Sequence, residues 1–165
     1  MIVFKERDTL IDHCHIQDSD LNIRSMAEED LKQVMDIEKI SFHSPWSLES
    51  FINDLRRSDA ISLVCQYDCH VVAYLVAWHV MDEVHIGNLA VHPDWRQRGL
   101  AQKLIHQLFF QHSDLRWAWL EVRKSNHPAR CLYNKLGFKE ISVRSNYYEA
   151  ECEDAIVMAK DLRHD

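Results

Sequence analysis

The chain has 165 residues, 47% hydrophobic and 27% charged, which is enough to bury a core without disulfides or metals. Its 19 basic and 26 acidic residues give a net charge of −7, which disfavours binding to a nucleic-acid backbone and permits a basic partner. No apolar run approaches the roughly 20 residues of a membrane span, and the charged residues 5–8 interrupt any signal-peptide stretch. The composition therefore predicts a soluble, cytoplasmic protein that contacts no membrane.

The five cysteines are odd in number and scattered, which indicates reduced thiols instead of a disulfide framework. Cys65 and Cys69 precede His70, and Cys14 lies between two histidines, so each group resembles part of a metal site. Neither group is followed by further ligands at metal-binding spacing. We therefore expect no metal.

No internal repeat or low-complexity linker divides the chain. Residues 1–20 lack clean periodicity and are treated as an N-terminal arm of unknown order. Residues 21–162 carry helix and strand patterns throughout, so they predict a single domain, with 163–165 as a C-terminal tail.

A short strand and two helices are expected to open this domain. Leu21–Arg24 alternates like a strand, and Ser25 followed by Glu28 forms a capping box that would start the first helix. Pro45 forbids a continuous helix, and Ser47 can cap the second one. The apolar face of that second helix consists of Leu48, Phe51 and Leu55.

Three strands are then expected at 60–66, 71–80 and 84–91, because these segments are rich in β-branched, aliphatic and aromatic residues. The short polar turns between them, at 67–70 and 81–83, imply antiparallel hairpins.

The rest of the domain alternates helices with strands. A long helix with a four-residue apolar repeat follows a glycine loop. A strand at 117–122, a helix at 128–136 ended by Gly137, and strands at about 138–146 and 155–159 complete the pattern. The repeat of the long helix comprises Leu100, Leu104 and Leu108, with Ala101 and Ile105 beside them. The whole pattern predicts an α/β (α+β) fold of about seven strands and about four helices.

The loop before the long helix, Arg96–Ala101, has the features of an anion site. Gly99 lets the backbone approach a ligand, and the helix start offers unpaired amides that suit a pyrophosphate. The loop has neither Walker nor GxGxxG spacing. Taken alone, it is equally consistent with a solvated helix start.

The loop resembles the R/Q-x-x-G-x-G/A hallmark of the GCN5-related N-acetyltransferase (GNAT) superfamily, which Arg96, Gly99 and Ala101 match. Residues 88–95 before the loop extend the resemblance, which covers roughly 21–162. It implies the GNAT fold, with a central mixed, mostly antiparallel sheet, and acetyl-CoA as co-substrate. It also implies that the backbone of Leu89, Ala90 and Val91 aligns the pantetheine arm. The pyrophosphate would be held at Arg96, Gln97, Arg98, Gly99, Leu100, Ala101 and Gln102.

Residues 119–126 and 132–138 resemble the bacterial ribosomal-protein alanine acetyltransferases, the RimI group. The resemblance implies that Glu121 is the general base, that Tyr133 is the general acid, and that Asn126 contacts the cofactor. These groups suit amine acylation, which needs a neutral nucleophile and a proton for the departing thiolate. A protein α-amine is already about 10% neutral at pH 7, so a mild base suffices, directly or through water.

Other readings of this block stay open. Glu121 is also consistent with a structural charge that pairs with Arg123 or Lys124, and Tyr133 with a tyrosine that only packs its ring. Cys131 is the rival nucleophile, but a cysteine in an apolar helical stretch is more often inert.

A third matching block, 144–158, would border the acceptor site. The resemblance places a hairpin there. We expect Tyr147 and Tyr148 to pack against an acceptor peptide, and an acidic rim to attract a basic one. The rim comprises Glu149, Glu151, Glu153 and Asp154. A solvated turn is the alternative. The break at Phe42–Trp46 would form the opposite wall, unless Trp46 only plugs the core between two helices.

The sequence therefore predicts an acetyl-CoA-dependent transferase, acting as a monomer on the N-terminal alanine of a small-subunit ribosomal protein. The alternatives are another protein N-terminus, a lysine, a small amine such as an antibiotic, or a non-catalytic acetyl-CoA-binding module.

Overall fold

The computed structural model describes residues 20–149 and 152–163. Most of the expected N-terminal arm, the end of the C-terminal tail and Glu151 lie outside these ranges. The first half consists of β1 (Leu21–Ser25), the 3₁₀ turn η3 (Glu28–Asp30), α1 (Leu31–Ser41), α2 (Leu48–Arg56), β2 (Ala60–Tyr67), β3 (His70–Val80) and β4 (Glu83–Val91). The second half consists of η4 (Pro93–Trp95), α3 (Leu100–Gln111), β5 (Trp117–Arg123), α4 (His127–Lys135), β6 (Lys139–Tyr148) and β7 (Glu153–Asp161).

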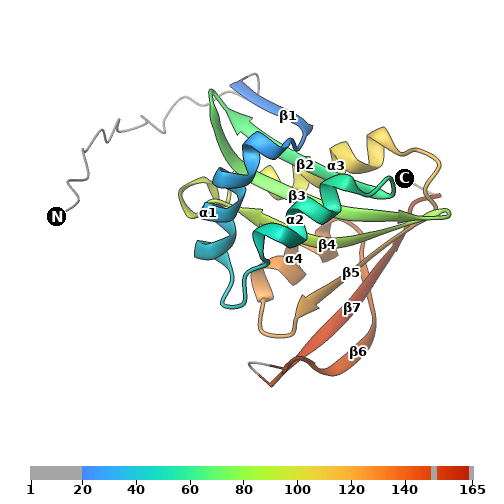
Figure 1. Ribbon diagram of the computed structural model, residues 1–165. Coiled ribbons are helices and arrows are strands. Elements are labelled where there is room, and N and C mark those ends of the chain that lie inside the picture. The colour runs from blue at the N-terminus through green and yellow to red at the C-terminus, as the bar shows by residue number, and fades with distance from the viewer. Residues whose placement is uncertain (1–19, 150–151, 164–165) are drawn as a thin grey trace.

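These strands form one seven-stranded sheet in the order β1-β2-β3-β4-β5-β7-β6 (Figure 1). Only β4 and β5 pair in parallel, and every other neighbouring pair is antiparallel. The expected mixed, mostly antiparallel sheet with four helices is therefore confirmed, and the expected strand ends shift by only one or two residues.

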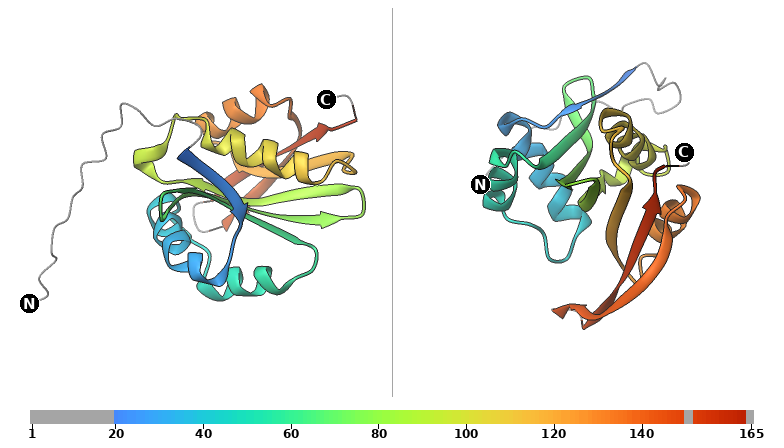
Figure 2. Two further views of the ribbon diagram at one scale, coloured as in Figure 1. Left: turned by 90° about the horizontal axis from the view of Figure 1, so that it is seen from above. Right: turned by 90° about the vertical axis from the view of Figure 1, so that its right-hand side faces the viewer.

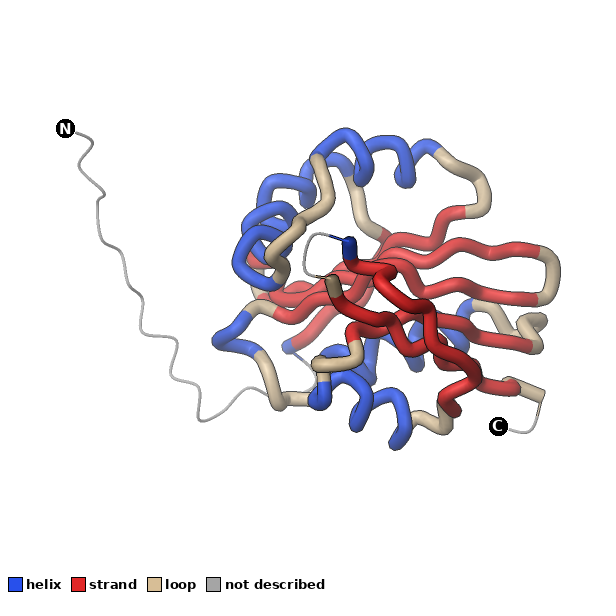
Figure 3. Tube along the Cα trace, turned by 90° about the horizontal axis from the view of Figure 1, so that it is seen from below, coloured by secondary structure: helices blue, strands red, loops and turns tan. Residues whose placement is uncertain are grey.

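The helices cover the sheet on both faces. In Figure 2, α1 and α2 lie on one side of the strands and α3 and α4 on the other, and Figure 3 shows the same layers from below. Each face has its own core cluster: Val34, Ile37, Phe51, Tyr74 and Val76 under α1 and α2, and Leu100, Leu104, Ile105, Leu108 and Phe138 under α3 and α4. The predicted stripe of α3 is therefore confirmed. In the part of the chain that the structure describes, no helix is both long and apolar enough to span a membrane.

A β-bulge at Gly87 shapes the centre of the sheet. Asn88 is paired with Val76 and Ile86 with Ala77, so Gly87 is the extra residue of β4. A Cβ atom added at Gly87 would overlap the ring of Trp78, whose Nε1 donates to Asp54 Oδ1 at 3.0 Å. Only glycine fits against this ring. The pairing of β4 with β5 also ends at Ile86, so the two strands separate where the bulge lies.

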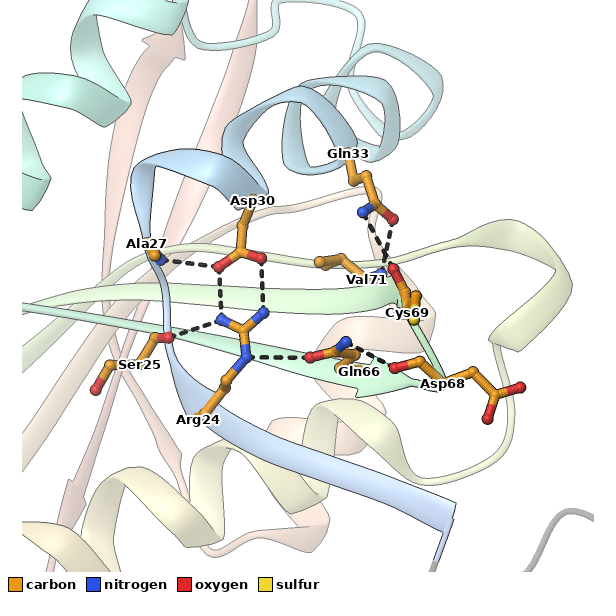
Figure 4. A network of polar contacts seen from close by, with 9 residues as sticks. All are labelled: Arg24, Ser25, Ala27, Asp30, Gln33, Gln66, Asp68, Cys69 and Val71. Atoms are coloured by element: carbon orange, nitrogen blue, oxygen red, sulfur yellow. Dashed lines mark hydrogen bonds and ion pairs between the residues drawn. The ribbon is translucent and has the colours of Figure 1, made fainter.

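The start of α1 differs from the expected capping box. Ser25 is the last residue of β1, and the Asp30 carboxylate instead accepts a hydrogen bond from the backbone N–H of Ala27 at 2.8 Å. Both oxygens of Asp30 also bind Arg24, at 2.6 and 2.7 Å (Figure 4). The buried ion pair selects Asp30 over Glu28, which is exposed.

The second helix begins as expected, since Ser47 Oγ accepts from the backbone N–H of Ser50 at 3.1 Å. Its expected apolar face is only partly correct. Leu48 is 48% exposed, because the helix turns Phe51 and the carboxylate of Asp54 towards the sheet.

The Gly87 bulge predicts a strong asymmetry between two glycine substitutions. Gly87→Ala should lower the free energy of unfolding by about 2 kcal/mol, because the added methyl overpacks the Trp78 ring. Gly99→Ala meets no atom within 4 Å and should cost only about 1 kcal/mol, from its φ of +77°. Urea denaturation of both variants measures the difference, and equal losses would contradict the steric argument.

The Arg24–Asp30 pair predicts an acid-dependent loss of stability. Hydrogen bonds from Arg24 lower the pKa of the Asp30 carboxyl against the opposing effect of burial. Asp30→Asn should therefore lose about 2 kcal/mol at pH 7. The difference from the wild type should begin to shrink as pH falls through about 4, the pKa of the unfolded carboxyl, and should vanish only below the lowered pKa of the folded carboxyl. Urea denaturation across this range measures it. The exposed Glu29→Gln is the control, and a pH-independent difference would argue against the pair.

Candidate active site

A cavity of about 370 Å³ lies where β4 and β5 separate. The two strands contribute residues 86–89 and 120–123, which begin at the last β4–β5 pair, Ile86 and Leu120. The remaining walls come from α1, the α1–α2 loop, α4 and the end of β6. The lining comprises Glu38, Phe42, Ser44, Trp46, Ile86, Gly87, Asn88, Leu89, Leu120, Glu121, Val122, Arg123, Asn126, Ala129, Tyr133, Tyr148 and Glu149.

The inner edges of both strands are open at this cavity. The described β4–β5 register runs only from Glu83↔Trp117 to Ile86↔Leu120, while β3 continues to pair with β4 as far as Val91. Along an extended strand, alternate residues direct their N–H and C=O groups to opposite edges. The expected pantetheine segment, Leu89–Val91, therefore has backbone groups on an edge to which an extended ligand can hydrogen-bond.

The expected pyrophosphate loop has the geometry of an anion site. Its backbone takes positive φ at Gln97 (61°) and at Gly99 (77°), and α3 begins at the next residue. The backbone N–H of Lys103 bonds to the carbonyl of Gly99 at 2.9 Å, so the three preceding amides of α3 lack helical partners. No atom lies within 4 Å of the Gly99 Cβ position, so the approach is open.

The side chains of the two arginines in this loop hydrogen-bond to neighbouring segments and stabilise its conformation. Arg96 Nε donates to the carbonyl of Val91 at 3.2 Å, and its Nη2 lies 3.4 Å from the Ser41 hydroxyl. Arg98 donates to the carbonyl of Asp94 at 3.1 Å and lies over the Trp95 ring. Both therefore fix the course of the loop and add positive charge beside the start of α3.

Glu121 lies on β5 with 28% of its side chain exposed. Its Oε1 is 3.1 Å from Nη1 of Arg144 on β6, a partner that differs from those expected for a structural charge. Arg123 pairs with Glu153, and Lys124 pairs with Asp154. The long-range pairing of β5, β7 and β6 brings Arg144 to Glu121, and sequence proximity does not reveal this.

Tyr133 is a buried residue of α4 that lines the same cavity. Its ring packs edge-on against Phe138 at 5.8 Å, and burial raises the pKa of its hydroxyl to about 12. The hydroxyl makes no hydrogen bond to another described residue. The phenol therefore keeps its proton at neutral pH and is available to a ligand in the cavity.

Asn126 also lines the cavity, and its Oδ1 caps α4 by accepting from the backbone N–H of Ala129 at 3.2 Å. Cys131 is exposed and is not part of the lining, so the expected apolar environment of this thiol is wrong.

The acidic residues of the β6–β7 hairpin divide into two groups. Glu153 accepts from Arg123 at 3.2 Å and from the Ser125 N–H at 2.8 Å, while Asp154 accepts from Lys124 and from the Asn146 N–H, each at 3.2 Å. These contacts lower the pKa of both carboxyls. Their charge is compensated by Arg123 at the end of β5 and by Lys124 in the loop that follows, so these two residues do not form a free acidic rim.

The rest of the expected acceptor side faces the cavity only in part. Glu149 and Tyr148 line it, and the Arg123 guanidinium lies 3.9 Å from the Tyr148 ring centroid. Tyr147 is 46% exposed and is not part of the lining, and Glu151 lies outside the described residues. Trp46 lines the cavity and also packs against Phe51 on α2 and Trp78 on β3.

Among the polar residues at the site that sequence reasoning missed are Glu38 and Asn88, which line the cavity, and Arg144, which pairs with Glu121. Glu38 was detectable, because it lies four residues after Val34 on the buried face of α1. The other two owe their positions to strand pairings that local patterns do not reveal.

Residues 31–138 match the model of the acetyltransferase (GNAT) family, and the chain belongs to this family.

Several similar proteins carry one name. The [ribosomal protein bS18]-alanine N-acetyltransferase of Salmonella typhimurium (strain LT2) is 35% identical over 141 residues, which cover 83% of this chain and 95% of that protein. A Bacillus subtilis (strain 168) relative is 40% identical over 82% of this chain and 92% of its own length, and bears the same name with a provisional qualifier.

Solved structures agree with this relationship. The ribosomal-protein-S18-alanine N-acetyltransferase of Escherichia coli superimposes with a TM-score of 0.80 at 32% identity, over 88% of this chain and 96% of that one. Arabidopsis thaliana NAA60 in complex with acetyl-CoA is 20% identical and superimposes with a TM-score of 0.77, over 86% of this chain and 99% of that one. At this identity the likeness supports the fold alone.

Proposed function

We propose that this chain transfers the acetyl group of acetyl-CoA to the α-amine of the N-terminal alanine of ribosomal protein bS18. The observation that carries the proposal is the cavity at the β4–β5 separation, which joins open strand edges to a carboxylate and a protonated phenol. The named relatives, which match this chain over most of their length, support the choice of acceptor.

We propose that acetyl-CoA extends from the loop before α3 to the cavity at the β4–β5 separation. The pyrophosphate binds the free amides at the start of α3, between Gln97 and Gln102, and the pantetheine runs along the open edge of Leu89–Val91. Asn126 contacts the cofactor with the side-chain amide that α4 capping leaves available. The thioester then lies in the cavity beside Glu121 and Tyr133.

The proposed reaction is a direct transfer without an acyl-enzyme. Glu121 accepts a proton from the alanine ammonium, directly or through water, while Arg144 holds the other carboxylate oxygen. The neutral amine attacks the thioester carbonyl carbon and forms the C–N bond. The C–S bond then breaks, and Tyr133 donates its proton to the departing thiolate sulfur. The nitrogen gives its second proton, through water, to the resulting Tyr133 phenolate, and Glu121 releases the first proton to solvent, so both groups return to their starting states.

The proposed acceptor side lies between the α1–α2 loop and the end of β6. Trp46 and Tyr148 form its two walls, and Glu149 supplies negative charge that attracts a basic N-terminal segment. Tyr147, on β6, borders this side, and we propose that Glu151 adds to its negative charge. We further propose that the protein acts as a monomer in the cytoplasm, without direct contact to nucleic acid or membrane.

A Tyr133→Phe variant tests the proposed acid. Its kcat should fall about 100-fold with little change in the KM for acetyl-CoA, because only the donated proton is lost. Since the pKa of Tyr133 is about 12, its ionisation should leave no inflection in the wild-type kcat profile between about pH 6 and 9. Steady-state kinetics measures both effects, with Tyr67→Phe as the matched control. Full turnover in Tyr133→Phe would eliminate this role.

The acceptor assignment predicts selectivity for a free N-terminus. In a cell-free assay, the peptide that begins with the bS18 alanine should be acetylated at its α-amine, with higher kcat/KM than peptides that begin with Ser or Met. The same peptide with a blocked N-terminus should stay unmodified at its lysines. Mass spectrometry locates the acetyl group.

The Glu121→Gln variant serves as the control against contaminating activity and should be at least about 100-fold slower on the alanine peptide. Activity on polyamines or aminoglycosides, but on none of the peptides, would overturn the proposed acceptor.

A further inference from the structure

The cavity contains a second carboxylate that the proposed proton transfers do not use. Glu38, in the last turn of α1, lines the cavity although only 1% of the residue is exposed. Removing a carboxylate from water is costly unless hydrogen bonds replace its hydration. The surroundings of Glu38 therefore show what this charge does.

Donors from three separate elements surround Glu38. The backbone N–H of Trp46, in the α1–α2 loop, donates to Oε1 at 2.7 Å. The side-chain amide of Asn88 on β4 lies 3.3 Å from both oxygens, and the hydroxyl of Tyr74 on β3 donates to Oε2. Burial and the neighbouring charge of Glu38 raise the pKa of Tyr74, so this hydroxyl stays a donor.

These contacts distinguish Glu38 from Glu121. Glu121 is partly exposed and pairs with Arg144, which leaves hydrogen-bonding capacity open on its carboxylate. Both oxygens of Glu38 already accept hydrogen bonds from neighbouring residues. Glu38 therefore acts through the groups that it holds.

The groups held by Glu38 belong to different elements that line the cavity. Trp46 stacks on Trp78 at 5.9 Å and contacts Phe51 at 5.5 Å, so its backbone and its ring are fixed independently. Asn88 directly follows the Gly87 bulge, where β4 leaves β5. The carboxylate thus connects the acceptor wall to the strand edge beside which the thioester would lie.

We infer that Glu38 is a positioning residue that fixes the Trp46 wall relative to β4 and so sets the affinity for the acceptor N-terminus. This inference rests on the proposed function. Because Glu38 holds the wall and not the α3 loop, its loss should weaken acceptor binding, with little effect on acetyl-CoA binding or on proton transfer.

Glu38→Gln tests this role with almost no change in volume. Its amide nitrogen would face donors, so one or more hydrogen bonds to a former charge are lost. We expect the KM for the alanine peptide to rise at least about ten-fold, since such bonds contribute about 1.5–3 kcal/mol. The KM for acetyl-CoA should change by less than about two-fold, and the pH profile of kcat should keep its shape.

Asp36→Asn is the matched control, because it removes one negative charge from an exposed position of the same helix and should leave all three quantities unchanged. If the peptide KM in Glu38→Gln rises no more than in Asp36→Asn, the inference is wrong. Equal rises in both KM values, or a shifted pH profile, would also overturn it.

Hydrogen exchange of the segment 42–47 separates this inference from the proposed function. The Trp46 N–H should exchange faster in Glu38→Gln than in the wild type and in Asp36→Asn, whatever the acceptor is. Unchanged exchange overturns the positioning role even if peptide acetylation is confirmed. If exchange is faster in Glu38→Gln but the wild type does not acetylate the peptide, Glu38 anchors Trp46 as inferred, and the proposed acceptor is wrong.

Tyr74→Phe provides a second variant that keeps the charge and removes one donor. It should raise the peptide KM in the same direction by a smaller factor, again without affecting the KM for acetyl-CoA. If Glu38→Gln does not fold, this variant carries the test, and an unchanged peptide KM in it counts against the inference.

Discussion

The separation of β4 from β5 is the constraint on which the rest of the structure depends. Four residue pairs join the two strands, and then the pairing stops at Ile86 and Leu120. Beyond this point the backbone N–H and C=O groups on the facing edges of β4 and β5 need partners other than each other. They border the cavity, where a ligand can supply those partners. The bulge at Gly87 makes this possible, because it turns β4 while the Trp78 ring occupies the space that any side chain would need.

The two halves of the sheet are held by different forces. Strands β1 to β4 lie between α3 on one face and α1 and α2 on the other, and burial is most complete along β3. The edge strand β6 is exposed along nearly its whole length. Besides strand pairing, ion pairs fix it and β7 to their neighbours, among them Arg144–Glu121, Arg123–Glu153 and Lys124–Asp154. The proposed acceptor side therefore relies on polar contacts, whereas the cofactor side relies on packing.

The cavity assigns different roles to two carboxylates through their surroundings alone. Glu121 lies at the strand separation with one guanidinium partner, and Glu38 lies behind the wall with donors from three elements. A group with open hydrogen-bonding capacity suits proton transfer, and a group with saturated capacity suits positioning. Tyr133 and Tyr74 divide in the same way, since only the Tyr133 hydroxyl is open to a ligand in the cavity.

The sequence by itself determined the seven strands, the four helices and the glycine loop, because periodicity, turn residues and short motifs are local properties. The pair Glu121 and Tyr133 was proposed from the resemblance to a known family. It misplaced the start of α1, where Asp30 binds Arg24 and takes the capping role expected of Ser25 and Glu28. Only the tertiary structure decided the partners of each charge. Glu38 and Asn88 are 50 positions apart, and Arg144 reaches Glu121 through two strand pairings. Such contacts follow from how the strands pair across the sheet, and no local pattern along the chain encodes that arrangement.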